Sequence, residues 1–238
     1  MRSFFEKTYK GTQQAFYADV KRCLAQEQKK LIVTANPETF MMGERDGEMS
    51  RVLLDENTTI IADGIGVLKG ANMLGIHMEE RLPGVELVET LFGYGNELGK
   101  SVFMLGAKQE VLDLLQQRLA KDFPNLKIAG AVNGYVADKD SVFAQIKELQ
   151  PDIVLVALGM GTQEKLIYKH YGDFCKGIFV GVGGSFDVLS GTKERAPKFF
   201  IDHNIEWLYR IMKEPKRFGR FYNNNVKFIF EVRKLAKK

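Results

Sequence analysis

The residues whose types are best suited to chemistry stand directly after apolar segments that are typical of buried strands. Asp63 follows the apolar segment 58–62, and Gly64 and Gly66 come next. A carboxylate in this position can accept a proton as a general base or hold a ligand hydroxyl. It can also cap a helix, because Asp is a favoured N-cap residue. The position alone leaves both roles open.

A second candidate stretch, GVGGSFDVLSGTKERAP, covers residues 181–197 and follows the apolar segment 177–180. Its glycines Gly181, Gly183 and Gly184 allow a sharp turn and the close approach of a ligand. A predicted short helix that contains Asp187 comes next. Three cations then surround Pro197: Lys193, Arg195 and Lys198. Together these features are typical of a phosphate site. A tight strand-to-helix turn with a solvated basic loop would show the same pattern.

Strands and helices alternate along the chain before Pro197. The predicted strands are apolar segments without regular alternation: residues 31–34, 58–62, 101–105, 126–132, 152–158 and 177–180. Such segments are typical of a parallel sheet that helices cover on both faces. We therefore expect an α/β fold over residues 1–195, with a mostly parallel sheet and flanking helices (a Rossmann-like core). Residues 196–238 are expected to form a C-terminal helical appendage.

The expected sheet gathers the candidate residues at one edge. In open α/β sheets, ligands bind beyond the carboxyl ends of the strands. Thr34 and Asn36 lie at the end of the first predicted strand, and Gln163 lies shortly after the fifth. We therefore expect these three polar residues to lie on the same side of the sheet as Asp63 and the glycine stretch.

The C-terminal part of the chain is basic. Residues 193–238 contain 13 Lys/Arg and 5 Asp/Glu, although the formal net charge of the whole chain is only +4. This asymmetry favours an anionic partner. Aromatic residues interleaved with these cations can lie in a bilayer interface, so we expect an anionic membrane surface and no nucleic acid as the partner. An ordinary helical cap, with its aromatics packed on the core, is the alternative.

Several other chemistries lack their motifs. The sequence has no HExxH, CxxC, GxxxxGK[ST] or complete GxGxxG, and no Asp-x-Asp at a strand end. We therefore expect no metal and no cofactor, so that arginines must neutralise a bound diphosphate. Cys23 and Cys175 are too few for a disulfide framework, which favours a reducing compartment. No apolar run approaches the ~18 residues of a membrane-spanning helix, and a signal peptide is not expected.

The motifs are specific enough to indicate a family. The chain resembles the WecG/TagA/CpsF-type bacterial glycosyltransferases, and it is most similar to the wall teichoic acid branch. The resemblance rests on motifs whose order and spacing match together over residues 30–222: Thr34–Asn36, Ala62–Gly66, Arg81–Leu87, Leu158–Lys165, Gly181–Asp187, Gly191, Arg195–Pro197, Glu206–Arg210 and Glu214–Arg217. Met160 departs from the proline that the family often has at this position.

The resemblance implies a metal-independent, inverting enzyme of teichoic acid biosynthesis. It would transfer N-acetylmannosamine from UDP-N-acetylmannosamine to undecaprenyl-diphosphate-linked N-acetylglucosamine, with a β-1,4 linkage. Asp63 is expected to be the catalytic base, together with Thr34. The expected substrate-binding residues are Asn36, Gln163, Gly181, Gly183, Gly184, Asp187, Arg195, Arg210, Arg217 and Arg220, of which the last three would neutralise the departing UDP. The appendage would then both associate with the membrane and complete the active site.

Other interpretations stay open at this point. A relative that uses UDP-N-acetylmannosaminuronic acid would share these motifs. An NAD-dependent nucleotide-sugar oxidoreductase would need the glycine fingerprint that is incomplete here. A non-enzymatic membrane adaptor would leave Asp63 and the glycines at the strand ends without a purpose. We expect a cytoplasmic protein, peripheral on the inner face of the cell membrane, and leave a homo-oligomer open.

Overall fold

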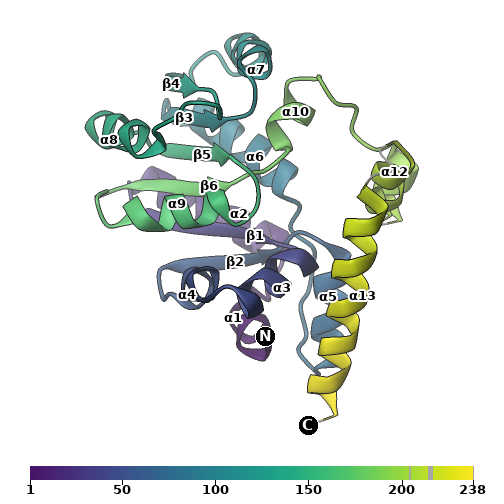
Figure 1. Ribbon diagram of the computed structural model, residues 1–238. Coiled ribbons are helices and arrows are strands. Elements are labelled where there is room, and N and C mark those ends of the chain that lie inside the picture. Colours follow the sequence, from purple (N-terminus) through teal and green to yellow (C-terminus); the bar gives the residue numbers. More distant parts are fainter. Residues whose placement is uncertain (204, 214–216, 238) are drawn as a thin grey trace.

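The computed structural model describes residues 1–203, 205–213 and 217–237; the side chains of residues 202, 210, 217, 218 and 220–224 also lie outside the description. Its centre is a six-stranded sheet, in which every pair of neighbouring strands is parallel, in the order β2-β1-β6-β5-β3-β4 (Figure 1). The strands are β1 (Lys29–Ala35), β2 (Thr58–Ala62), β3 (Ser101–Gly106), β4 (Lys127–Val132), β5 (Ile153–Ala157) and β6 (Gly177–Gly181). The predicted α/β fold with a parallel sheet is confirmed.

Helices cover both faces of the sheet. The helices before the last strand are α1 (Arg2–Lys7), α2 (Gln13–Ala25), α3 (Pro37–Arg45), α4 (Gly47–Leu54), α5 (Ile65–Met73), α6 (Gly84–Glu97), α7 (Gln109–Asp122), α8 (Lys139–Leu149) and α9 (Thr162–Tyr171). Those after it are α10 (Ser185–Leu189), α11 (Lys198–Asp202), α12 (Glu206–Lys213) and α13 (Arg217–Ala236). The chain thus has a helix after every strand, as parallel crossovers require.

Alternate strand residues supply the two halves of the core. Ile32 points toward a cluster built with α2, α6, α7 and α10, whereas Leu31 and Val33 point to the opposite face. On that opposite face, one cluster involves α1, α3, α4, α5 and α13, and another involves α8 and α9. This period of two explains why the central strands are apolar over most of their length: side chains on both faces of the sheet meet a layer of helices.

Helix α1 did not follow from the sequence, and it contributes two of the most buried side chains. Phe4 and Phe5 are 2% and 0% exposed. The Phe5 ring meets Phe40 of α3 edge-on, with the ring centroids 4.9 Å apart. At six residues the helix is too short to show a helical period in the sequence.

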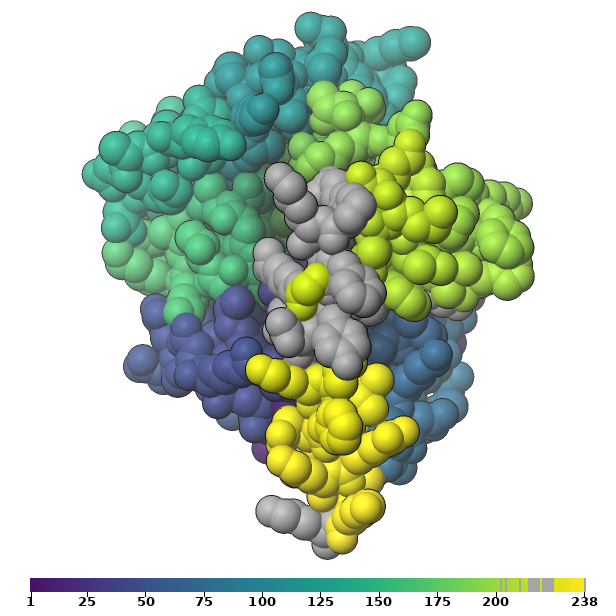
Figure 2. All heavy atoms as spheres, turned by 45° about the vertical axis from the view of Figure 1, so that its right-hand side comes forward, coloured from purple at the N-terminus to yellow at the C-terminus, as the bar shows by residue number. Residues whose placement is uncertain are grey.

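Helix α13 lies alongside α5 and α3 (Figure 1), and its C-terminal half lies between residues of α3–α4 and α5 in the space-filling view (Figure 2). Phe228 and Val232 of α13 are 1% and 0% exposed and belong to the cluster that contains Phe5. The distal half of the predicted appendage therefore contributes to the hydrophobic core. Among the described helices, α13 included, none combines the length and apolarity needed to cross a bilayer.

Candidate functional site

The sheet reverses its direction of growth between β1 and β6. From β1 the chain moves outward to β2 on one side, whereas β6, β5, β3 and β4 lie on the other. In open α/β sheets, ligands bind beyond the carboxyl ends of the strands at such a switch point. The candidate residues that follow β1, β2 and β6 lie at this edge of the sheet.

Asp63 lies beside the end of β1. Ala62 pairs with Ala35, and the Asp63 N–H donates to the Ala35 carbonyl at 2.9 Å, which extends the ladder by one bond. The Asp63 Oδ1 atom accepts a hydrogen bond from the N–H of Gly84 at 2.7 Å. Gly84 is the first residue of α6, so the carboxylate lies at the positive end of a 14-residue helix. Asp63 therefore has a fixed orientation and also caps a helix, although not the helix that follows it in sequence.

Thr34 connects β1 to the glycine stretch. Its hydroxyl donates to the carbonyl of Gly181 at 3.2 Å. A Cβ atom on Gly84 would lie 3.3 Å from the Thr34 Cγ2 atom, so Thr34 and the start of α6 are in close contact. Since Gly84 also binds Asp63, the ends of β1, β2 and β6 form one packed group around Thr34.

Asn36 caps α3. Its Oδ1 atom accepts from the N–H groups of Glu38 and Thr39 at 2.9 and 3.1 Å. The Thr39 hydroxyl accepts from the Asn36 N–H at 3.1 Å, which completes a reciprocal cap. A substrate contact by Asn36 would therefore have to come from its Nδ2 group.

Gln163 is 3% exposed and holds the glycine turn after β6. Its Oε1 atom accepts from the N–H of Gly183 at 3.1 Å, and its Nε2 atom donates to Glu164 Oε1 at 2.8 Å. A Cβ atom on Gly181 would lie only 2.7 Å from the Gln163 Nε2 atom, so any larger residue here would displace the Gln163 amide from its hydrogen bonds. Gly183 has a φ of +50°, in the left-handed region that glycine tolerates. The Gln163 side chain therefore lies close to Gly181 and Gly183, where the sequence predicts the close approach of a ligand.

Asp187 lies at a polar hollow of about 430 Å³ beyond the ends of β3 and β4. Its carboxylate pairs with Lys193 at 3.4 Å. Acidic and basic side chains, one aromatic side chain and three small or apolar residues line the hollow: Ala107, Lys108, Glu110, Val111, Tyr135, Asp187, Thr192 and Lys193. Tyr135 is 76% exposed and so presents a ring on which a planar group could stack.

The predicted arginines divide into two sets. Arg195 forms an ion pair of 2.7 Å with Glu86 of α6, next to the end of the glycine stretch. The side chains of Arg210, Arg217 and Arg220 lie outside the described residues. The start of α12, the helix that contains Arg210, nevertheless has a defined contact with the core, because Glu206 forms an ion pair of 3.2 Å with Arg81. Arg81 directly precedes the segment that leads into α6, so α12 begins close to the Asp63 side of the site.

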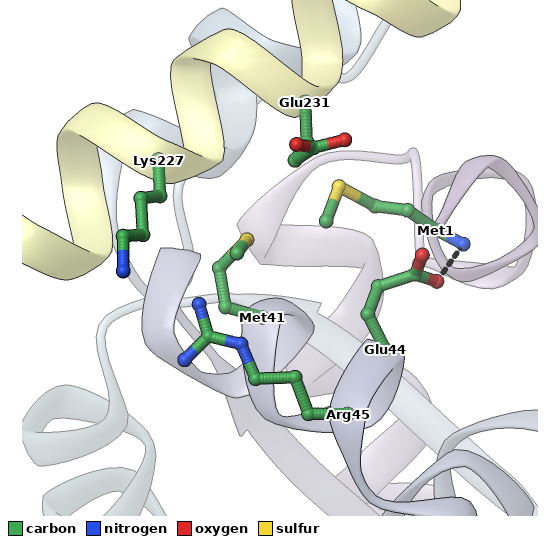
Figure 3. Close-up of a pocket in the computed structure, with 6 residues that line it drawn as sticks. All are labelled: Met1, Met41, Glu44, Arg45, Lys227 and Glu231. Atoms are coloured by element: carbon green, nitrogen blue, oxygen red, sulfur yellow. Dashed lines mark hydrogen bonds and ion pairs between the residues drawn. The ribbon is translucent and has the colours of Figure 1, made fainter.

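A second hollow, of about 370 Å³, lies between α3 and α13 (Figure 3). The Met1 ammonium group pairs with Glu44 on one side of it, and Arg45 and Lys227 lie on the other. Its lining contains none of the candidate residues: Met1, Met41, Glu44, Arg45, Lys227 and Glu231. This hollow is a gap between the appendage and the core, away from the ends of the strands.

Three residues of the site had no role assigned to them from the sequence. Gly84 contacts Asp63 from 21 positions away, Tyr135 lies in a loop after β4, and Glu164 is buried beside Gln163. Only Glu164 has a local signal, because glutamate at the third position of a helix is typical of a capping box. In the described part of the chain, no group of three His, Cys, Asp or Glu side chains lies close enough to hold a metal ion.

Nearly the whole chain is similar to a known family of enzymes. The family model described as the glycosyl transferase WecG/TagA/CpsF family matches residues 4–238. The chain is 38% identical over 200 residues to an N-acetylglucosaminyldiphosphoundecaprenol N-acetyl-beta-D-mannosaminyltransferase of Bacillus subtilis (strain 168), covering 84% of this chain and 78% of the relative. A protein of the same name from Staphylococcus aureus (strain MW2) is 35% identical over 208 residues, covering 87% and 81%. The chain therefore belongs to the WecG/TagA/CpsF family of glycosyl transferases.

Proposed function

We propose that this protein transfers N-acetylmannosamine from UDP-N-acetylmannosamine to N-acetylglucosamine on undecaprenyl diphosphate, forming a β-1,4 linkage in the synthesis of the teichoic acid linkage unit. The observation that carries the proposal is the Asp63 carboxylate, held at the switch point by the Gly84 N–H. The relatives' names specify the same acceptor lipid and the same sugar. The donor is inferred as the UDP-activated form of that sugar.

Asp63 is the proposed base. Its carboxylate takes the proton of the acceptor 4-hydroxyl while that oxygen forms a bond to the anomeric carbon of the donor sugar. The bond from the anomeric carbon to the phosphate oxygen breaks at the same time, and UDP leaves with the electron pair. Attack from the face opposite to UDP converts the α-linked donor into a β-linked product. Thr34 and Gln163 support this geometry through the glycine turn.

The UDP group would lie toward the hollow at Asp187. Four strand spacings, each about 4.8 Å, separate β2 from β3, so the hollow and Asp63 are roughly 19 Å apart across the sheet. An extended nucleotide sugar has a length of this order. In our proposal the uracil stacks on Tyr135 and Asp187 accepts hydrogen bonds from the nucleoside, while Lys108 and Lys193 contribute positive charge.

Arginines of the appendage would neutralise the departing UDP. Arg210 follows Glu206 by four residues in α12, the helix that Arg81 holds near the Asp63 side of the site. Arg217 and Arg220 follow in the first turn of α13. Guanidinium groups can bind phosphate oxygens with two hydrogen bonds each, which makes a divalent cation unnecessary in this proposal.

The decisive experiment measures UDP release from two donors in competition. UDP-N-acetylmannosamine and UDP-N-acetylmannosaminuronic acid are supplied together with an undecaprenyl-diphosphate-linked N-acetylglucosamine acceptor. We expect acceptor-dependent release and a disaccharide that contains N-acetylmannosamine. Incorporation of the uronic acid instead would show that the donor is wrong. A lack of any acceptor-dependent release would refute the proposed transfer.

We also propose that the appendage binds an anionic membrane surface, where a polyprenyl acceptor resides. Phe199, Met212 and Phe230 on three successive helices are 61%, 64% and 58% exposed. Exposed apolar residues beside cations such as Lys227 are suited to a bilayer interface. Co-sedimentation with phosphatidylglycerol vesicles should be lost in Met212→Asp/Phe230→Asp and kept in the control Leu114→Asp, whose side chain is 43% exposed on α7. Equal sedimentation of both variants would locate the membrane surface elsewhere.

A further inference from the structure

Glu164 is a buried carboxylate to which the proposed transfer assigns no role. It is 2% exposed, in the first turn of α9. Its Oε2 atom accepts from the N–H of Gly161 at 2.6 Å, and its Oε1 atom accepts from the Gln163 side chain at 2.8 Å. Burying a carboxylate is costly unless hydrogen bonds compensate it, so a glutamate here needs a reason.

The hydrogen bonds continue from Glu164 into the glycine turn. Gln163 donates to Glu164 through Nε2, so its Oε1 atom is oriented to accept from the Gly183 N–H at 3.1 Å. A carboxylate side chain only accepts when ionised, and a glutamine amide has one donor end and one acceptor end. Glu164 at one end and the Gly183 N–H at the other therefore favour the same orientation of the Gln163 amide.

We propose that Glu164 is a positioning residue, which fixes the orientation of the Gln163 amide and thereby holds the β6–α10 turn in the shape that binds the donor. The proposal rests on the transfer proposed above, because the turn leads directly to Asp187 at the hollow. The turn is also joined to Thr34 through the Gly181 carbonyl. Glu164 would thus act on both ends of the donor through other residues, without touching it.

Burial and hydrogen bonding act on the Glu164 carboxylate in opposite directions. Burial raises the pKa of the Glu164 carboxyl above its usual range, while the hydrogen bonds from Gln163 and Gly161 oppose that shift. Both oxygens accept, which is the arrangement of an ionised carboxylate. The N-terminus of α9 adds a favourable potential for the negative charge.

The substitution Glu164→Gln breaks this arrangement whichever way the new amide turns. If its oxygen faces Gly161, Gln163 must present its own oxygen to the new amide, so that two donors meet at Gly183. If its oxygen faces Gln163, two donors meet at Gly161. We expect amide hydrogen exchange at one of these glycines to become about tenfold faster or more.

The swap Gln163→Glu/Glu164→Gln restores every bond. The carboxylate at position 163 accepts from Gly183 and from the amide at position 164, whose oxygen accepts from Gly161. Glu164→Gln should raise the KM for the donor and the Kd for UDP about tenfold, with the acceptor KM within about twofold. The swap should recover most of both losses. The control Glu48→Gln removes an exposed first-turn glutamate of α4 and should change none of these values beyond about twofold.

Unchanged exchange at Gly161 and Gly183 in Glu164→Gln would overturn the proposal. Failure of the swap to restore exchange and UDP affinity would also overturn it, because a substrate contact by the Gln163 amide would then explain the loss. Wild-type protein that binds no UDP would refute the proposed transfer, whereas the exchange rates of the three variants would still decide whether Glu164 holds the turn.

Discussion

The buried position of Phe228 in α13 leads to a quantitative prediction about where the folded core ends. Its ring lies 5.9 Å from the Phe5 ring and 6.4 Å from the Phe40 ring, measured between centroids. A Cβ atom on Gly70 of α5 would lie 3.0 Å from the end of the Phe228 ring. The ring therefore packs closely against α5 at a position where that helix has no side chain. Phe228 is thus enclosed by α1, α3 and α5.

The substitution Phe228→Ala removes a fully buried ring and leaves a cavity among these helices. Phe→Ala changes in protein cores cost about 3–5 kcal/mol. For a chain of this length each kcal/mol lowers Tm by about 2–4 °C, so we expect a decrease of roughly 6–20 °C. The matched control is Phe230→Ala, because Phe230 lies on the same helix and is 58% exposed. Its cost should stay within about 0.5 kcal/mol.

Thermal denaturation followed by circular dichroism gives the Tm of both variants and of the wild type. A core that ends at residue 195, the boundary expected from the sequence, would lose nothing from either substitution. Equal midpoints for Phe228→Ala and Phe230→Ala would therefore refute the packing of α13 into the core. A large decrease in Tm for Phe228→Ala alone would show that α13 is part of the core. A truncation before α13 would then destabilise the protein, so surface substitutions are the suitable test of the appendage's function.

Three further predictions concern the site and its surroundings. Asp63→Asn keeps an oxygen for the Gly84 N–H but cannot take the acceptor proton, so turnover should fall about 10²-fold or more at unchanged Tm; near-normal turnover would exclude Asp63 as the base. EDTA should leave the rate nearly unchanged, and a loss that Mg²⁺ restores would show that a metal neutralises the diphosphate. Burial would raise the pKa of Asp152, but hydrogen bonds from Lys176 and Ser101 outweigh it and hold that pKa below its usual range. Asp152→Asn should therefore lower the unfolding free energy at pH 7, with the difference from wild type vanishing as the pH falls through the folded pKa; a difference independent of pH would contradict this.

Much of the fold could be predicted because its signals are local. The predicted strand 58–62 coincides with β2, and the other five predicted strands overlap β1, β3, β4, β5 and β6 in the same order along the chain. Strands buried on both faces are apolar over their whole length, and Pro and Gly mark their ends. Helix α1 escaped prediction because the burial of Phe4 and Phe5 depends on α3, α4 and α13, which come later in the chain.

By itself, the sequence determined the residue types at the site and the edge of the sheet where they meet. Asp63, Thr34 and Gln163 follow or end apolar strands, and the carboxyl ends of parallel strands share one edge. Only the tertiary structure decided what each group contacts. Glycine at position 181 predicted a close approach, but the strand order β1-β6-β5 places Gln163 and Glu164 against it. Hydrogen bonds act over about 3 Å, and which groups lie within that distance depends on how distant segments pack.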